Sequence, residues 1–279
     1  MVKYLIIVVL YNKAPREAST LVSLSNMQVD MCKNMRVVLW NNSPSDYDAT
    51  SKVELHNMLK EFKVDYIYNG GENLPLSVIY NRSIREFLDD DEMLVIMDDD
   101  SVFDEQLFRC ASVNIAQNPA VDLFLPIVYN GNEIVSPAYM NGFKGHYLKH
   151  VSPGLMSTRH TTAINSGMII RASYLRHGFE GYDERIKFYF TDNDFMSRYD
   201  ASHKELFVLD YKMRHTLDFY KKGESYERKK RRFRDLRRAF LILMRRQGFI
   251  TYLLTQAYLF VYSVKFAIIQ KDIRYIFVF

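Results

Sequence analysis

Three groups of polar residues have types and spacing that suit chemistry. Asp98–Asp100 is an acidic triplet that directly follows the apolar segment VIM. Carboxylates are hard oxygen ligands for Mg²⁺ or Mn²⁺, and a cation among them would relieve the repulsion between neighbouring like charges. A second acidic pair, Asp192 and Asp194, follows an aromatic stretch, and a lone His215 follows a later apolar segment. These residues predict a cation site and a carboxylate that could abstract a proton.

Each group also has a purely structural explanation. An acidic triplet followed by serine is typical of a solvated turn. Acids at a helix start complement the helix dipole, and a lone histidine is more often structural than a ligand. Asp192 and Asp194 are two positions apart, so on one helix they point in different directions. Asp192 is the candidate base, and Arg198 is its expected structural partner.

The first half of the chain alternates apolar strands with helices. Near-continuous apolar strands in this arrangement predict a parallel sheet that is covered on both faces. The expected strands are residues 4–10, 35–43, 64–69 and 92–98, and the expected helices are residues 16–28, 51–62, 74–88 and 105–118.

In parallel sheets, ligands bind outside the carboxyl ends of the strands. That rule brings four loops to one rim, namely residues 11–13, 40–43, 69–73 and 98–101. The acidic triplet therefore lies where a ligand is expected.

The second half of the chain is less regular. Residues 121–135 predict two strands around an Asn-Gly turn. Residues 136–160 are rich in Gly and Pro and show no periodicity, so we expect a long functional loop there. A strand that leads into a helix is expected over 162–175, and a closing strand begins at Glu205, with His215 just past its end.

From the first strand to His215, the motifs have a characteristic order. YNK and NNS follow the first two strands, and NLPLSVIYNRSI, VIMDDDS, NSGMIIR, TDNDFMSR and MRHT come after them. This order resembles inverting family 2 glycosyltransferases of the GT-A fold. It is most similar to the rhamnosyltransferase and galactofuranosyltransferase branch of that family.

The resemblance implies an α/β architecture with a Rossmann-like, mostly parallel central sheet and helices on both faces. We expect a GT-A catalytic domain over 1–220, with a nucleotide-sugar half at about 1–130 and an acceptor half at about 131–220. A basic, amphipathic helical extension is expected over 221–279.

The resemblance also implies roles for single residues at the positions that match its motifs. Its second acidic motif supplies the catalytic base, which is Asp192 here. Asp194 and Arg198 complete that motif, although Asp194 stands where glutamate is usual and Thr191 where many members have an acid. The other matches fall at the metal (Asp100, His215 and Asp98), at the nucleotide or donor (Tyr11, Asn42, Asn81, Asp98 and Asp99) and near the acceptor (Ser166 and Gly167).

The implied activity is metal-dependent transfer of a sugar from a UDP- or dTDP-sugar. The acceptor would be a hydroxyl of a glycan or a lipid-linked acceptor in surface polysaccharide synthesis. Mn²⁺ or Mg²⁺ on Asp100 and His215 would neutralise the leaving diphosphate. Asp192 would take the acceptor proton in a single displacement with inversion, and the loop over 136–160 would close over the donor.

Two rival functions stay open. A metal-dependent nucleotidyltransferase also uses carboxylates on an α/β sheet, but no Gly-rich nucleotide loop with a following basic residue occurs near the first strand. The other rival is a membrane-docked protein that binds nucleotide-sugars without turnover. Release of a nucleoside diphosphate, of pyrophosphate or of neither product separates the three functions.

The charge is unevenly distributed along the chain. The net charge is +4, but residues 221–246 contain 12 Lys and Arg against 3 Asp and Glu, so the remainder is acidic. The composition, with 48% hydrophobic and 25% charged residues, is typical of a globular protein. Cys32 and Cys110 have no metal-ligand spacing and suit a reducing compartment.

The segment 248–269 carries an apolar stripe at helical spacing and is long enough to span a bilayer, but several polar residues interrupt it. With the basic segment before it, the pattern favours contact with an anionic membrane surface through 221–269. We therefore expect a cytoplasmic protein, peripheral on the inner face of the cytoplasmic membrane. A solvated helix packed on the body and a transmembrane span are the alternatives; nucleic acid is not an expected partner because the body is acidic.

Overall fold

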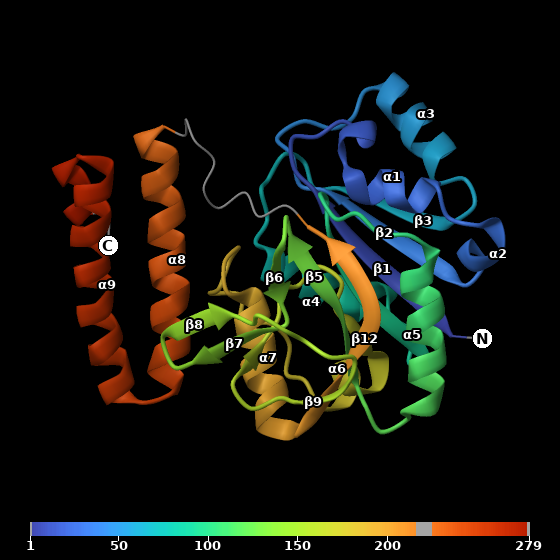
Figure 1. Ribbon diagram of the computed structural model, residues 1–279. Coiled ribbons are helices and arrows are strands. Elements are labelled where there is room, and N and C mark those ends of the chain that lie inside the picture. Colours follow the sequence, from blue (N-terminus) through green and yellow to red (C-terminus); the bar gives the residue numbers. More distant parts are fainter. Residues whose placement is uncertain (1, 216–224, 278–279) are drawn as a thin grey trace.

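A nine-stranded mixed sheet forms the centre of the body in the computed structural model, which describes residues 2–215 and 225–277 (Figure 1). Its strands are β1 (Lys3–Leu10), β2 (Met35–Asn41), β3 (Lys63–Tyr68), β4 (Glu92–Asp98), β5 (Leu123–Asn130), β6 (Glu133–Ser136), β9 (Gly154–Ser157), β11 (Ile169–Arg171) and β12 (Glu205–Arg214).

The strand order is β3-β2-β1-β4-β11-β5-β12-β9, and β6 pairs with β5. Strands β1 to β4 are parallel to one another, and β12 is parallel to β5. The short β11 is antiparallel to both β4 and β5, between which it lies. The structure therefore confirms the predicted α/β class with a mostly parallel central sheet.

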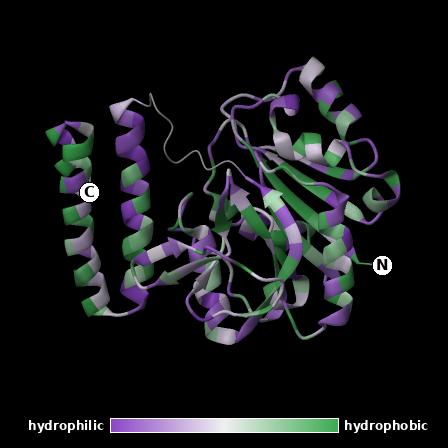
Figure 2. Ribbon diagram, in the orientation of Figure 1, coloured by the Kyte–Doolittle hydropathy of each residue, from purple (hydrophilic) through white to green (hydrophobic). Residues whose placement is uncertain are grey.

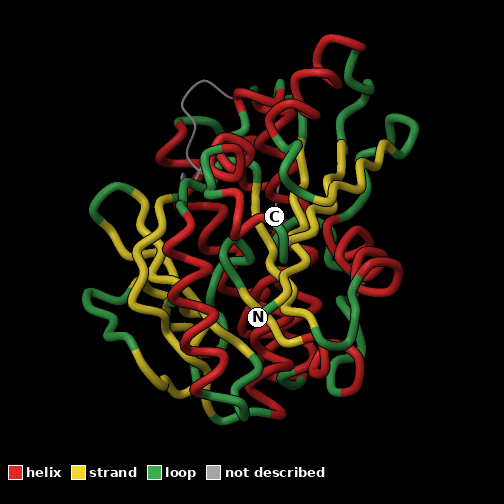
Figure 3. The backbone as a smooth tube through the Cα atoms, turned by 90° about the vertical axis from the view of Figure 1, so that its right-hand side faces the viewer, coloured by secondary structure: helices red, strands yellow, loops and turns green. Residues whose placement is uncertain are grey.

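Helices cover both faces of this sheet (Figure 3). Alternate residues of β1 point to opposite faces, so Ile6 and Val8 belong to one core and Leu5 and Ile7 to the other. The first core includes residues of α1 (Ser19–Ser25), α2 (Val29–Cys32), α3 (Ala49–Met58) and α5 (Glu105–Gln117). The second includes residues of α4 (Leu76–Phe87), α6 (Ala172–His177) and α7 (Thr191–Ser202).

The structure corrects the prediction of an irregular loop over 136–160. A second, three-stranded sheet in the order β10-β7-β8 is built from β7 (Ala138–Asn141), β8 (Lys144–Tyr147) and β10 (Thr161–Thr162). The end of the same segment contributes β9 to the main sheet, antiparallel to β12. Strands of two to four residues are too short to show an alternating pattern in the sequence.

Two long antiparallel helices, α8 (Tyr226–Arg246) and α9 (Phe249–Gln270), form a C-terminal hairpin beside the body (Figure 1). Phe240, Leu243 and Met244 of α8 pack with Leu259 of α9 and with Ile186 of the body. The short helices η1 (Pro15–Glu17) and η3 (Ile273–Phe277) complete the elements of the described residues. The first residues of the predicted basic segment, 221–224, lie outside the described residues.

The apolar stripe of α9 faces away from α8. Ile250, Val261 and Ile268 are exposed by 74%, 65% and 71%, whereas Thr255 and Ser263 are fully buried. The two buried hydroxyls donate to backbone carbonyls of their own helix, at 2.7 Å each, so they are satisfied without a partner helix. The hairpin thus exposes an apolar helix next to the more polar α8 (Figure 2). Within the described residues, Phe249–Ile269 alone has the length and composition to cross a membrane.

Candidate active site

The acidic triplet forms the turn at the carboxyl end of β4, as predicted from the apolar strand before it. Thr20 of α1 holds this turn in place. Its hydroxyl donates to the carbonyl of Asp98 and accepts from the backbone N–H of Ser101 at 3.1 Å, and its own N–H donates to the carbonyl of Asp99. The three carboxylates are therefore displayed from a fixed backbone.

His215 lies directly after β12 and meets two of the three aspartates. Its Nδ1 lies 3.0 Å from Oδ1 of Asp100, and its Nε2 lies 3.8 Å from Oδ2 of Asp98. One ligand atom from each of the three residues lies within 4.8 Å of the others. β12 reaches this rim because it is parallel to β5, so its carboxyl end lies at the same edge of the sheet as that of β4.

This cluster fits a divalent cation. The buried Oδ1 of Asp100 has no well-directed hydrogen bond from any described residue, despite its short distance to His215. A buried carboxylate oxygen without a partner is costly, and a metal ion would satisfy it. Two carboxylates and one imidazole are a donor set that suits Mn²⁺ and also accommodates Mg²⁺.

Burial and mutual repulsion shape the electrostatics of the cluster. Burial raises the pKa of Asp98 to about 6, with His215 opposing the rise and Asp100 and Asp99 adding to it. Burial lowers the pKa of His215, but Asp100, Asp98 and Asp99 together raise it above its ordinary value. The cluster thus holds excess negative charge, which attracts a cation.

Asp99 points to a different partner. Its Oδ1 lies 2.6 Å from Nζ of Lys13, in the loop after β1. Burial raises the pKa of Asp99, and Lys13 opposes that rise. Sequence reasoning missed Lys13, although it lies in the first of the four loops expected on the rim.

Asp192 occupies the first turn of α7, which begins directly after Phe190 in the left-handed backbone region. The backbone N–H of Asn193 donates to its Oδ1 at 2.8 Å. Burial raises the pKa of Asp192 to about 6; that N–H opposes the rise, and the charge of Asp98 adds to it. The fully buried Tyr80 of α4 lies near both carboxylates. Burial is the main cause of its raised pKa, and the charges of Asp98 and Asp192 raise that pKa further. The structure thus brings the candidate base near Asp98 of the candidate metal cluster.

Asp194 points away from Asp192, as predicted for two acids of one helix. It is completely buried, with Nε of Arg198 at 3.3 Å and with Arg246 of α8 in direct contact. The expected pairing of Arg198 with Asp192 is therefore wrong, because one helical turn separates Arg198 from Asp194. Arg246 also contacts Asp183. Its two ion pairs join the C-terminal hairpin to the body, and the pair with Asp194 does so at the first turn of α7.

The predicted donor-side residues have different environments. Tyr11 is 44% exposed on the rim, where a ring could meet a base. Asn42 is 2% exposed and bonds the loop after β3, because its amide donates to Asn73 and Leu74 and accepts from the N–H of Leu74, all within 2.9 Å. Asn81 of α4 exchanges two hydrogen bonds with the backbone of Tyr182, at 2.9 and 2.7 Å. Direct contacts of Asn42 and Asn81 with a donor stay predictions.

Ser166 and Gly167 lie behind the acidic turn. The hydroxyl of Ser166 accepts from the N–H of Asp98 at 3.1 Å and is bonded to the hydroxyl of Ser101. Gly167 has φ +89°, and a Cβ there would lie 2.7 Å from Pro126 and 2.8 Å from Met213. These two residues lie between the carboxyl end of β4 and the strands β5 and β12. Their predicted role toward the acceptor stays a prediction.

Solved structures of glycosyltransferases share this fold. The chain aligns with S. aureus TarS 1-349 at a TM-score of 0.57 and 14% identity, covering 86% of this chain and 64% of that one. It aligns equally with a mannosyltransferase of Pyrobaculum calidifontis at 12% identity, covering 87% and 64%, and with GalNAc-T7 at a TM-score of 0.55 and 12% identity, covering 80% and 46%. No known protein-family model and no curated protein matches the chain.

These likenesses confirm the GT-A fold that the sequence resemblance implies. TarS 1-349 has been solved with UDP-GlcNAc, the mannosyltransferase with GDP-Man and Mn²⁺, and GalNAc-T7 with UDP, GalNAc and Mn²⁺. The chain spans somewhat less than two thirds of the length of the TarS 1-349 and mannosyltransferase structures. At this level of identity, the likeness concerns the fold, and activity has to be argued from the site.

Proposed function

We propose that the protein is a metal-dependent, inverting family 2 glycosyltransferase. The observation that carries the proposal is the cluster of Asp98, Asp100 and His215 at the carboxyl end of β4, with Asp192 close enough to feel the charge of Asp98. A divalent cation held by the cluster would neutralise charge on a leaving nucleoside diphosphate. The cluster lies at the carboxyl ends of the strands, which is where α/β sheets generally bind their ligands.

Asp192 acts as the general base in this proposal. Its partly buried carboxylate has a pKa near 6, so it is ionised at neutral pH yet more basic than an ordinary aspartate. It takes the proton of the acceptor hydroxyl while that oxygen attacks the anomeric carbon from the face opposite the diphosphate. One protein carboxylate is enough, and the configuration at the anomeric carbon inverts.

The proposed donor is a UDP- or dTDP-sugar, and the proposed acceptor is a hydroxyl of a surface glycan or a lipid-linked precursor. The motif order of the rhamnosyltransferase and galactofuranosyltransferase branch supports this choice. A thermal-shift screen of nucleotide-sugars with Mn²⁺ or Mg²⁺ identifies the donor, and NMR of the product reports the anomeric configuration. Retention of configuration, or release of pyrophosphate instead of a nucleoside diphosphate, would contradict the proposal.

The C-terminal hairpin supports a peripheral position on the inner face of the cytoplasmic membrane. Arg228, Arg231, Arg234 and Arg238 form an exposed basic stripe on α8, and α9, the other helix of the hairpin, exposes an apolar stripe that faces away from α8. Basic side chains beside an apolar helix face suit anionic headgroups. Co-sedimentation with vesicles of phosphatidylglycerol, but not with phosphatidylcholine alone, is the expected result. Equal binding to both, or to neither, would contradict this placement.

A further inference from the structure

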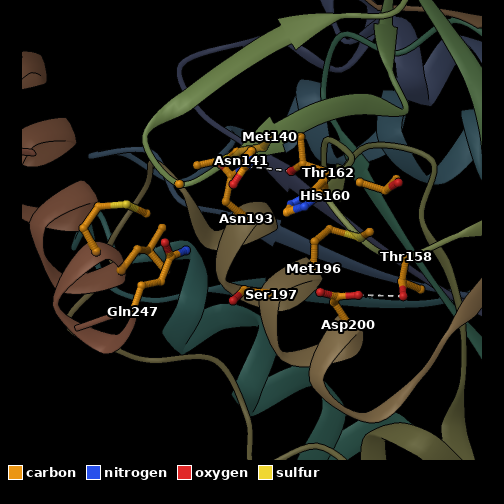
Figure 4. A pocket seen from close by; sticks show the side chains of 14 residues that line it. Met140, Asn141, Thr158, His160, Thr162, Asn193, Met196, Ser197, Asp200 and Gln247 are labelled. Carbon is orange, nitrogen blue, oxygen red and sulfur yellow. Dashed lines mark hydrogen bonds between the residues drawn. The ribbon is translucent and has the colours of Figure 1, made fainter. Parts of the chain in front are cut away.

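A polar groove lies on the side of α7 that faces the small sheet (Figure 4). It has a volume of about 260 Å³, slightly below the usual range for drug-sized ligands. Asn193 and Ser197 of α7 form its floor, Asn141 and Thr162 belong to the small sheet, and Gln247 at the end of α8 closes one side. Three separate parts of the chain therefore build this groove, including the C-terminal hairpin.

The chemistry of the groove suits an uncharged polyhydroxyl ligand. Of the described residues that line it, none is Lys or Arg, which disfavours a phosphate group. Amides and hydroxyls supply donors and acceptors in both directions, and Met140 supplies adaptable apolar surface, whereas Met196 and Met244 are almost fully buried. Asp200 at the far end already accepts from Thr158 at 2.7 Å. This combination of neutral polar groups and apolar surface matches a sugar ring rather than a nucleotide.

The groove begins one residue from the candidate base. The side-chain amide of Asn193, on the floor of the groove, donates to the hydroxyl of Thr162 at 2.6 Å, and its backbone N–H donates to Asp192. Consecutive helix residues point about 100° apart around the axis, so the groove and the face of Asp192 adjoin without coinciding. A ligand in the groove would thus be a neighbour of the reacting group.

The side of the groove that Gln247 closes (Figure 4) adjoins the exposed start of α9. Gln247 lines the groove, and Phe249 and Ile250, which are 72% and 74% exposed, follow it closely. A ligand that is sugar at one end and lipid at the other could therefore extend from the groove onto this apolar surface.

We propose that this groove is a binding subsite for an uncharged sugar of the acceptor, one unit away from the sugar whose hydroxyl reacts at Asp192. The inference rests on the proposed glycosyltransferase function and deepens it. The subsite fixes the acceptor before transfer, and it makes acceptor recognition depend on the docked C-terminal hairpin, because Gln247 belongs to that hairpin.

The test fills the groove without touching the proposed catalytic residues. Ser197 is exposed on α7, so Ser197→Trp blocks the groove at little cost to folding, and Ser202→Trp places the same ring at another exposed position, about 140° around the same helix. Asn141→Ala is a second variant that removes one amide and adds no bulk. The probes are methyl glycosides of glucose, galactose, mannose, N-acetylglucosamine and rhamnose, followed by saturation-transfer NMR.

At least one glycoside should bind the wild type and Ser202→Trp, with an affinity at least tenfold weaker in Ser197→Trp and reduced in Asn141→Ala. Absence of binding to the wild type, or equal binding to Ser197→Trp, overturns the subsite. Calorimetry with UDP or dTDP and Mg²⁺ runs in parallel on all the variants. Failure of the wild type to bind the nucleotide would count against the proposed function. If the nucleotide binds but no glycoside binds in the groove, only the subsite is wrong.

Discussion

Lowering the pH from 8 to 5 should reduce the transfer rate about tenfold if Asp192 is the base. Burial raises the pKa of Asp192 to about 6 from an ordinary 3.8. A carboxyl group with a pKa of 6 is roughly one-eleventh ionised at pH 5, whereas one with a pKa of 3.8 is more than about nine-tenths ionised. Because the base works only when ionised, activity is lost as the pH falls through the raised pKa.

The assay has to separate this effect from loss of the metal. His215 has a raised pKa and must be neutral to bind a cation, so metal affinity also falls in acid. Initial rates are therefore measured by chromatography of quenched samples at saturating Mn²⁺, and a further tenfold increase in Mn²⁺ should leave them unchanged. Calorimetry confirms that the nucleotide stays bound at pH 5. A rate at pH 5 within twofold of that at pH 8 would refute the assignment of Asp192.

Three further predictions concern stability. Arg246→Met should lower the free energy of unfolding by about 2–4 kcal/mol, because among the described residues it leaves Arg198 as the one cation beside the buried Asp194, and adding Asp194→Asn should recover part of that loss; a urea midpoint equal to that of the wild type contradicts this. Gly167→Ala should cost about 1–3 kcal/mol because of its positive φ and the close atoms of the neighbouring strands, lowering the melting temperature by several degrees; an unchanged melting temperature counts against it. Mn²⁺ should raise the melting temperature, and EDTA should reverse the rise; no shift at millimolar Mn²⁺ speaks against the metal site.

Most of the parallel half of the fold can be predicted from sequence because its strands are long and apolar. Residues 4–10 and 92–98 are almost entirely buried on both faces of the sheet, and their sequences are nearly continuous apolar runs. Such runs are typical of parallel strands that helices cover on both faces. Once four such strands are parallel, the acidic turn must lie on the same rim as the loop after β1. The prediction that Asp98–Asp100 meets His215 needed the resemblance as well, because 115 or more residues separate them in the sequence.

The contacts that escaped prediction depend on packing between distant elements. Nothing local marks Arg246 as the partner of Asp194, since its side chain reaches α7 only after α8 has docked on the body. The resemblance implied a nucleotide contact for Asn42, yet the hydrogen bonds of its side chain go to the loop after β3. The small sheet was missed because its strands are too short for their periodicity to be seen.

Product analysis of a nucleotide-sugar reaction with three proteins tests the central claim most directly. The wild type, Asp100→Ala and Asp192→Ala are incubated with the donor found by thermal shift, with Mn²⁺ and, separately, with EDTA. We expect Mn²⁺-dependent release of the nucleoside diphosphate by the wild type, with losses of at least a hundredfold in both variants. Release of pyrophosphate, full activity in EDTA, or full activity of either variant would contradict it.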